Sequence, residues 1–406
     1  MLLRSGVPSL GDYGEWTYHG VLLRDVLQGH ADAAYALKNY PVPNSLTVAG
    51  LGVLMLVLPW KIAMKVWLLC ELGLGLVCMQ QLQRASGRLQ GWRVVVLAGA
   101  MLLGTTFWFG FTNFMFGIYL AMLLCSMLLQ GVESRWRYAS LLLLIFFSHM
   151  IPFGFAVLVL GLYAAQTGRW KLLWQTGPAF AVTAWYFAGR MAHGNADGRA
   201  GMVAAAPYLT GQFLLYKVNS YLKCWGFVNP AIGGEDSVLL KVAGAKVFVL
   251  LFVLNGIVAL GVLGLLALEA RRAIKERTPQ RFFWAAVSGF LLVSLLMPGA
   301  MAGISDPGGR MLQVAAWCGV CLAVARGRWL GEVLGGCAFV LLAVNCWMLQ
   351  TVAMGVPMTG STGEKIPAHV REFAHVYYSS KAAYLWDVET GQREREIFPT
   401  ALFLKR

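Results

Sequence analysis

The chain has 406 residues, of which 58% are apolar and only 13% charged, and its mean hydropathy is +0.63. Soluble domains carry roughly a quarter charged residues, so this composition excludes an ordinary soluble protein. The formal net charge is +14, but no basic stripe is interleaved with aromatic residues as in nucleic-acid-binding proteins. We therefore attribute the charge to Lys and Arg beside membrane spans and expect no nucleic acid as a partner.

Long apolar runs recur along the whole chain without the period-two alternation of a membrane β-barrel. They predict an all-α, polytopic transmembrane helix bundle of about ten spans. The run 138–164 contains Pro152 and is long for one crossing, so it is either one kinked helix or a pair of half-helices. The expected spans are 45–60, 62–80, 93–109, 111–130, 138–164, 171–189, 246–268, 282–299, 311–326 and 331–354.

The polar stretches between these runs define the domain organisation. We expect a long external loop with amphipathic helices and a short external polar C-terminal tail of short strands or irregular structure. The expected divisions are an acidic amphipathic segment at the outer membrane face (1–44), an N-terminal transmembrane module (45–189), the external loop (190–245), a C-terminal transmembrane module (246–356) and the tail (357–406).

Orientation follows from the excess of Lys and Arg in cytoplasmic loops. The loop EARRAIKERTPQR, residues 269–281, has five cationic residues and is expected inside. Counting the spans backwards from this loop gives a conflict between the expected sides of residues 1–44 and of the arginines that follow the second span. If 138–164 crosses once, residues 1–44 lie outside, but so do Arg84, Arg88 and Arg93. If 138–164 is a re-entrant pair, these arginines lie inside and residues 1–44 lie there with them.

The segment GDYGEWTYHG, residues 11–20, concentrates ionisable side chains in a chain with only 19 acidic residues. On a helix, Asp12, Glu15 and His19 are spaced by three and four residues and share one face. Such a group can do general acid–base work or bind a divalent cation. A solvated, capped amphipathic helix at a membrane surface explains the same spacing.

Two ionisable residues interrupt apolar runs, and such residues at membrane depth often mark function. Glu71 lies within WLLCELGLGLV and His149 within FFSHMIP. Each is either a functional group or the partner of a neighbouring helix. Cys318-Gly-Val-Cys321 has the spacing of metal ligands, but it is mid-span without His or acidic neighbours, which favours close helix packing.

Three stretches resemble the bacterial GT-C-type integral membrane glycosyltransferases, which use polyprenyl-phosphate sugars. They are the acidic segment followed by the Pro-Asn entry LKNYPVPNSLT, the span TFWFGFTNFMFGIYLAML, and LLLLIFFSHMIPFGF with His149 near Pro152. The resemblance covers roughly the first 190 residues. Members of this family begin with a span before the acidic loop. We therefore expect either that such a span precedes this sequence or that residues 1–44 do not face outside. The resemblance also implies a multi-pass protein of the bacterial inner (cytoplasmic) membrane.

The resemblance implies transfer of a sugar from a polyprenyl-phosphate donor to a glycan, lipid or protein acceptor at the outer membrane face. It implies Asp12 as the base, with Glu15 second, and Arg310 in GISDPGGRM as the holder of the donor phosphate. An Arg fork fits phosphate oxygens, although Arg310 also suits a simple interfacial anchor. The residues expected to bind substrate are His19, Lys38, Asn113, His149 and Arg310.

No cofactor is certain, although a divalent cation, Mg²⁺ or Mn²⁺, could be held by Asp12 and Glu15. Two other functions stay open. A transporter or lipid flippase would depend on Glu71 and His149 rather than on Asp12. A non-catalytic membrane subunit would depend on none of these residues.

Overall fold

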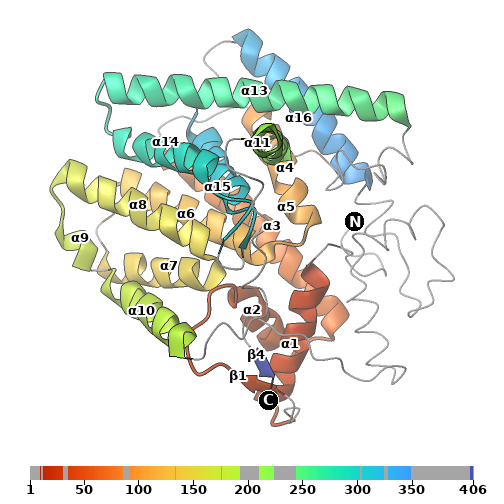
Figure 1. Cartoon of the computed structure of the whole chain (residues 1–406), viewed down its shortest axis with the longest axis vertical. Coiled ribbons are helices and arrows are strands. Elements are labelled where there is room, and N and C mark those ends of the chain that lie inside the picture. Colours follow the sequence, from red (N-terminus) through yellow and green to blue (C-terminus); the bar gives the residue numbers. More distant parts are fainter. Residues whose placement is uncertain are drawn as a thin grey trace.

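The computed structural model describes residues 10, 12–30, 35–85, 92–132, 134–174, 176–192, 210–223, 244–301, 304–323, 328–348 and 403–405. These residues form helices almost throughout, with two short antiparallel strand pairs (Figure 1). The all-α class expected from the sequence is therefore confirmed.

In chain order, the helices and strands are α1 (Tyr13–Leu27), β1 (Tyr35–Leu37), α2 (Leu46–Leu54), α3 (Trp60–Ala85), α4 (Trp92–Leu102), α5 (Thr105–Trp108), α6 (Thr112–Leu129), α7 (Arg135–Ser148), α8 (Met150–Thr167), α9 (Lys171–Trp174), α10 (Gly177–Ala192), α11 (Gly211–Lys223), α13 (Ala245–Lys275), α14 (Arg281–Leu296), β2 (Ala300–Met301), β3 (Ile304–Ser305), α15 (Pro307–Leu322), α16 (Arg328–Met348) and β4 (Phe403–Lys405).

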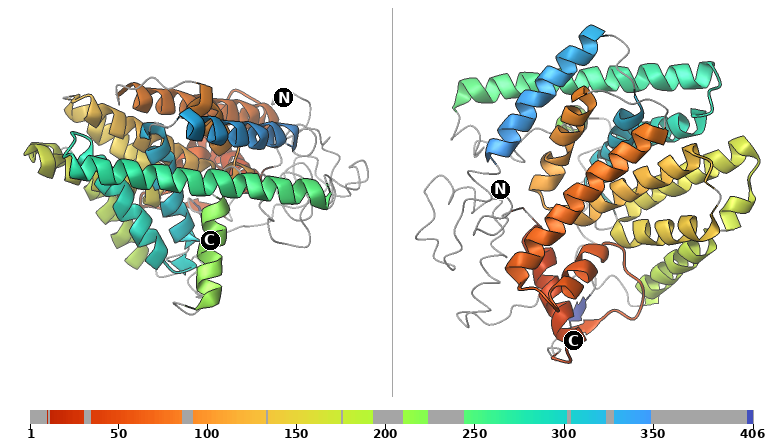
Figure 2. Two further views of the ribbon diagram at one scale, coloured as in Figure 1. Left: turned by 90° about the horizontal axis from the view of Figure 1, so that it is seen from above. Right: turned by 180° about the vertical axis from the view of Figure 1, so that it is seen from behind.

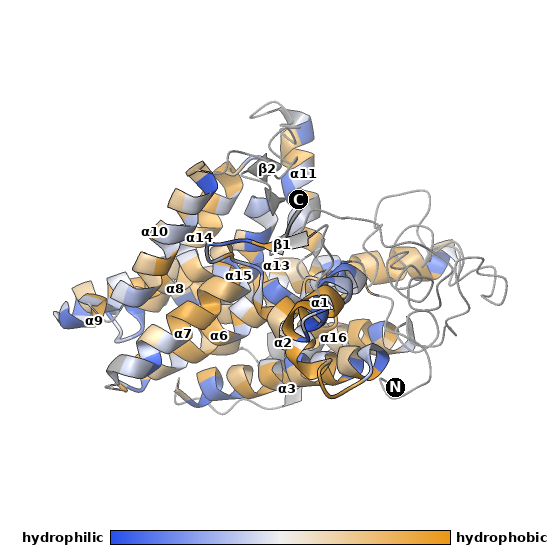
Figure 3. Ribbon diagram, turned by 90° about the horizontal axis from the view of Figure 1, so that it is seen from below, coloured by the Kyte–Doolittle hydropathy of each residue, from blue (hydrophilic) through white to orange (hydrophobic). Residues whose placement is uncertain are grey.

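Four of the described helices, α3, α6, α8 and α13, are long and apolar enough to cross a membrane. Parts of α4–α5, α7, α14 and α16 form shorter apolar helices. Apolar residues dominate these elements (Figure 3), and many of their large side chains are exposed, as on Leu260, which is 69% exposed. An exposed apolar side chain on a long apolar helix suits contact with lipid, so the structure fits a membrane protein.

Four expected spans do not form one continuous helix. The run 93–109 divides into α4 and α5, and 171–189 divides into α9 and α10. The run 45–60 contains only the nine residues of α2, which extend about 14 Å and cannot cross a hydrocarbon core of roughly 30 Å. The run 138–164 breaks into α7 and α8, which pack against each other. The break lies at His149, whose backbone is extended at φ −168° and ψ 139°, whereas Pro152 sits in the first turn of α8, where proline is tolerated.

The core is built from helix pairs both near and distant in sequence. α3 packs on α6, α14 on α15, α4 on α16, and α1 on α2, and Figure 2 shows α3 and α16 on the same face of the bundle. Gly319 permits one close approach, because a Cβ there would lie 2.5 Å from Cδ2 of Leu266 on α13. With Cys318 and Cys321 buried beside it, the helix-packing interpretation of this segment is confirmed.

Two further elements come from the segments predicted to be polar. α11 is seen end-on in Figure 1, whereas α13 beside it lies along the plane of view. Leu214, Leu215 and Val218 of α11 are each more than half exposed, whereas Phe213 is 4% exposed. In the tail, β4 pairs antiparallel with β1, which agrees with the first of the two expected forms, short strands. The other tail segments lie outside the described residues.

Candidate functional site

The start of α1 is held by backbone contacts to the turn before α6. The amide of Asp12 donates to the carbonyl of Phe109 at 2.7 Å. The next residue, Gly110, has φ +69°, and a Cβ there would lie 2.4 Å from the backbone nitrogen of Tyr13. Only glycine fits both the left-handed conformation and this approach. The contact fixes Asp12 at the N-cap position of α1, where its side chain makes no capping hydrogen bond.

The start of α15 is fixed by Asp306, which was not selected from the sequence. Asp306 adopts φ +47° and ψ +57°, and its carboxylate accepts a hydrogen bond from the amide of Gly309 at 2.9 Å. Proline follows at the first helical position, where it is favoured, although the left-handed backbone of Asp306 is unusual for an N-cap residue. The cap places Arg310 in the first turn of α15, and the backbone amide of Arg310 donates to the carbonyl of Asp306 at 3.1 Å.

Arg310 then reaches the break between α7 and α8. Its Nη1 lies 3.1 Å from Nε2 of His149. Its guanidinium stacks over the ring of Phe111 at 4.3 Å and lies 5.5 Å from the ring of Phe114. The ring of Phe114 in turn meets the imidazole of His149 edge-on at 5.0 Å. Three sequence-distant segments therefore hold one guanidinium in a fixed orientation.

The hydrogen bonds of His149 determine which of its nitrogens carries a proton. Nδ1 caps α8 by accepting a hydrogen bond from the amide of Ile151 at 3.1 Å, so Nδ1 is unprotonated. In the tautomer that keeps this hydrogen bond, the single N–H of the neutral imidazole is on Nε2, the nitrogen that faces Arg310. Arg310 also offers only donors. The two side chains therefore present two adjacent N–H groups that need a shared acceptor, such as a carboxylate or phosphate oxygen.

Two nearby carboxylates influence the charge of the Arg310 guanidinium. Burial disfavours the charged guanidinium of Arg310, whereas the charges of Asp12 and then Asp306 favour it. Asp12 and Arg310, which the sequence predicted as base and phosphate holder, are thus brought into electrostatic range. His149 joins them, so three of the predicted site residues share one location.

α11 packs against α15 and places Ser220, Tyr216 and Lys217 near Asp306 or the end of α14. Ser220 donates to Oδ2 of Asp306 at 2.9 Å. Burial, followed by the charge and hydrogen bond of Asp306, raises the pKa of Tyr216. Lys217 donates to the carbonyls of Ser294 and Met297 at 2.7 and 2.6 Å, which closes the end of α14. Burial lowers the pKa of Lys217, and Asp306 opposes that shift.

The other predicted residues lie in different surroundings. Glu15 is partly buried in the first turn of α1. His19 is 1% exposed and contacts the rings of Trp16 and Tyr18. α1 is therefore largely buried against α2, which excludes the alternative of a solvated surface helix.

Lys38 and Asn113 make local contacts. Lys38 lies over the ring of Tyr40 at 5.8 Å. The amide of Asn113 accepts from the backbone of Thr47 at 2.8 Å and donates to the carbonyl of Asn44 at 2.9 Å. This clamp joins α6 to the start of α2, so the Asn in the aromatic motif has a structural role that the motif did not predict.

Glu71 faces the protein interior, as expected of an ionisable group in a span. It is 0% exposed, and neither carboxyl oxygen has a hydrogen-bond partner within the described part of the chain. Its charge acts on Tyr13, whose pKa is raised first by burial and then by Glu71. The hydroxyl of Tyr13 donates to the carbonyl of Met64 at 2.6 Å.

Sequence reasoning missed Phe111, Tyr216, Ser220 and Asp306. Only Asp306 left a signal, because Asp followed by Pro is a helix-start pattern. In the described ranges, no three His, Cys, Asp or Glu side chains gather where they could hold a metal ion. No protein-family model matches the chain, and neither the curated proteins nor the solved structures include one similar to it.

Proposed function

We propose that the protein is a membrane glycosyltransferase that moves a sugar from a polyprenyl-phosphate donor to an acceptor at the outer membrane face. The observation that carries the proposal is the pair of donors formed by Arg310 and His149, which lies within electrostatic range of the carboxylate of Asp12. This combination provides a holder for a phosphate beside a base for an acceptor hydroxyl.

In the proposed reaction these groups have the following roles. The carboxylate of Asp12 takes the proton from the acceptor hydroxyl, whose oxygen attacks the anomeric carbon of the sugar. The bond between that carbon and the phosphate oxygen breaks, and the configuration inverts. The polyprenyl phosphate leaves with its bonding electron pair, and the two N–H donors stabilise the charge that develops on its oxygen.

The short length of α2 supports an external site. In our proposal 269–281 lies inside and α13 and α10 each cross once, so residues 210–223 lie outside and α9 lies inside. In our proposal α7 and α8 form a hairpin whose turn at His149 faces outside. α6, α4–α5 and α3 then each cross once. Because α2 is too short to cross, residues 12–45 face outside, on the same side as Arg310.

This arrangement removes the conflict in the charge count. The loops it places inside are rich in Lys and Arg, as the positive-inside rule requires. Their cationic residues are Arg84, Arg88, Arg93, Arg135, Arg137, Arg169, Lys171, Arg271, Arg272, Lys275, Arg277, Arg281, Arg326 and Arg328. In this arrangement Arg84, Arg88 and Arg93 lie inside, whereas the carboxylate of Asp12 lies outside.

Cysteine labelling on intact cells tests the sidedness. Tyr13 is fully buried, so the probe is placed at the exposed Gln28, at the end of α1, in a cysteine-free background. A membrane-impermeant thiol reagent should label Gln28→Cys directly. It should label the control Arg137→Cys, also exposed, only after permeabilisation. A Gln28→Cys protein that is labelled only after permeabilisation would exclude chemistry at the outer face by Asp12.

The activity itself is tested with purified protein in nanodiscs and a panel of radiolabelled polyprenyl-phosphate sugars. Wild type should release polyprenyl phosphate from one donor, and Asp12→Asn should not. If no donor is turned over and a polyprenyl phosphate added alone does not bind, the proposal fails.

A transporter remains the second candidate because Glu71 is fully buried in a candidate span with both carboxyl oxygens unpartnered in the described structure. A buried carboxyl that can gain and lose a proton suits coupled transport. Glu71→Gln distinguishes the two functions. It should leave sugar transfer within about threefold of wild type, whereas a proton-coupled transporter would lose transport and keep ligand binding.

A further inference from the structure

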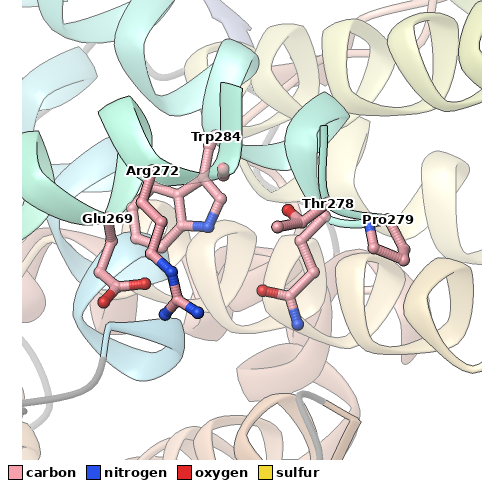
Figure 4. Close-up of a pocket in the computed structure, with 7 residues that line it drawn as sticks. Glu269, Arg272, Thr278, Pro279 and Trp284 are labelled. Atoms are coloured by element: carbon pink, nitrogen blue, oxygen red, sulfur yellow. The ribbon is translucent and has the colours of Figure 1, made fainter. Parts of the chain in front are cut away.

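A cavity of about 240 Å³ lies between the end of α13 and the start of α14 (Figure 4). Glu269, Arg272, Thr278, Gln280 and Trp284 line it. In Figure 4 the side chains of Glu269 and Arg272 extend side by side into the cavity, and Trp284 lies behind them. The volume is below the roughly 300–1,000 Å³ of sites that enclose whole small molecules. It suits a polar group whose remainder stays outside.

Arg272 gives the cavity a donor. Its Nε donates to the carboxylate of Glu276 at 2.9 Å, which fixes the plane of the guanidinium. Its Nη1 is buried, and no hydrogen-bond acceptor for it occurs among the residues that the structure describes. A buried donor without an acceptor costs about 1–3 kcal/mol. A ligand oxygen in the cavity would satisfy it.

The charge around the cavity favours an anion. Segment 269–281 carries five cationic and two acidic side chains. α14 starts at Arg281 and has no acidic residue in its first turn, so the positive end of its dipole also faces this region. The carboxylate of Glu269 adds one acceptor, which favours an anion that also carries a hydroxyl or ammonium donor.

An apolar stripe connects the cavity to the surface of a candidate span. Ile257, Leu260 and Leu268 are 39%, 69% and 62% exposed. They follow helical spacing along α13 and lead to Arg272 one turn after Leu268. Between them, Gly264 leaves open space. A ligand with its polar end at Arg272 can therefore lay an acyl chain along this stripe.

We propose that this cavity binds the headgroup of an anionic glycerophospholipid, with its phosphate on Arg272 and a headgroup hydroxyl donating to Glu269. Basic pockets at the ends of membrane helices are suited to such headgroups. Phosphatidylglycerol has the required phosphate and hydroxyls, whereas phosphatidylcholine has no headgroup donor for Glu269. The site does not depend on the proposed sugar transfer.

Native mass spectrometry of the full chain in detergent tests the proposal, with phosphatidylglycerol and phosphatidylcholine of identical acyl chains as probes. Wild type should bind phosphatidylglycerol about tenfold more tightly, as expected from one charge-assisted contact. Arg272→Gln should remove that preference. Arg271→Gln removes the same charge from the exposed neighbouring residue outside the cavity, and it should change binding less than threefold.

Equal losses in Arg272→Gln and Arg271→Gln would overturn the proposal, because a diffuse surface charge would then explain binding. Equal binding of the two lipids by wild type would also overturn it. Inorganic phosphate at millimolar concentration should not displace the lipid, and displacement would identify a site for free phosphate instead. If Arg272→Gln does not fold, Arg272→Lys and Arg271→Lys form the test pair. Only Arg272→Lys should then weaken binding.

Discussion

Nη1 of Arg310 lies 3.1 Å from Nε2 of His149, although 161 residues separate them in sequence. In the tautomer whose Nδ1 accepts the hydrogen bond from the backbone of α8, both facing nitrogens carry protons. The contact is therefore a two-donor site rather than a conventional hydrogen bond, and Asp12 and Asp306 supply the negative charge around it.

Substitution of Arg310 should weaken phosphate binding according to the geometry of the replacement. Arg310→Gln removes the charge and should lower the transfer rate on the order of 100-fold. Arg310→Lys keeps the charge but loses the planar fork, and a loss of about tenfold is expected. Release of polyprenyl phosphate measures both. Arg84→Lys, at an exposed arginine, is the control. Full activity in Arg310→Lys would reduce Arg310 to an interfacial anchor.

His149 has two separable contacts, one to α8 and one to Arg310. In His149→Asn the side chain can still cap α8, because Asn is a good N-cap residue, but it is too short to replace Nε2. We expect an unchanged melting temperature and about tenfold weaker binding of a polyprenyl phosphate. If binding is unchanged while the variant stays folded, the two-donor assignment is wrong.

Asp12 and Glu15 were predicted together, but only Asp12 acts on Arg310 in the structure. Asp12→Asn should abolish sugar transfer and leave membrane insertion intact, because the side chain of Asp12 makes no capping hydrogen bond in α1. Glu15→Gln should keep transfer within about tenfold of wild type. The two initial rates, compared at equal protein levels, decide between them. A reversed order would make Glu15 the base.

Replacing Gly110 by alanine should cost more stability than replacing Gly131. Both have a left-handed backbone, at φ +69° and φ +66°. Alanine costs about 1–2 kcal/mol of unfolding free energy at either position through φ alone. At Gly110 the new Cβ also meets the backbone of Tyr13, whereas at Gly131 nothing lies within 4 Å. Thermal unfolding in detergent should therefore show a larger loss for Gly110→Ala, together with loss of Asp12-dependent activity. Equal losses would contradict this packing.

We expect the partly buried phenol of Tyr216 to lower the free energy of unfolding at high pH. Its pKa is raised above the ordinary 10.0, first by burial and then by Asp306. Above pH 10 the unfolded phenol releases its proton and the folded one keeps it, so the free energy of unfolding decreases as pH rises. The melting temperature of wild type should therefore drop more steeply between pH 9 and pH 11 (about one unit either side of the unshifted value) than that of Tyr216→Phe. Parallel curves would exclude this effect.

The class of the protein and much of its helix content could be predicted from the amino-acid order alone. Apolar runs of sufficient length predicted α3, α6 and α13, because hydropathy summed over a long window does not depend on tertiary contacts. The sequence also predicted that Glu71 faces the interior, since a carboxyl at membrane depth is costly in lipid. The choice of Asp12, His149 and Arg310 came from their residue types and motifs.

How these residues meet depends on long-range packing. Hydropathy counts apolar residues but not helix breaks, so it could not show that α2 stops after nine residues or that the chain turns at His149. Asn113 was predicted to bind substrate, whereas in the folded chain its amide clamps the start of α2. The approach of α15 to the turn at His149 joins segments far apart in sequence, and no local pattern encodes the 3.1 Å between their side chains.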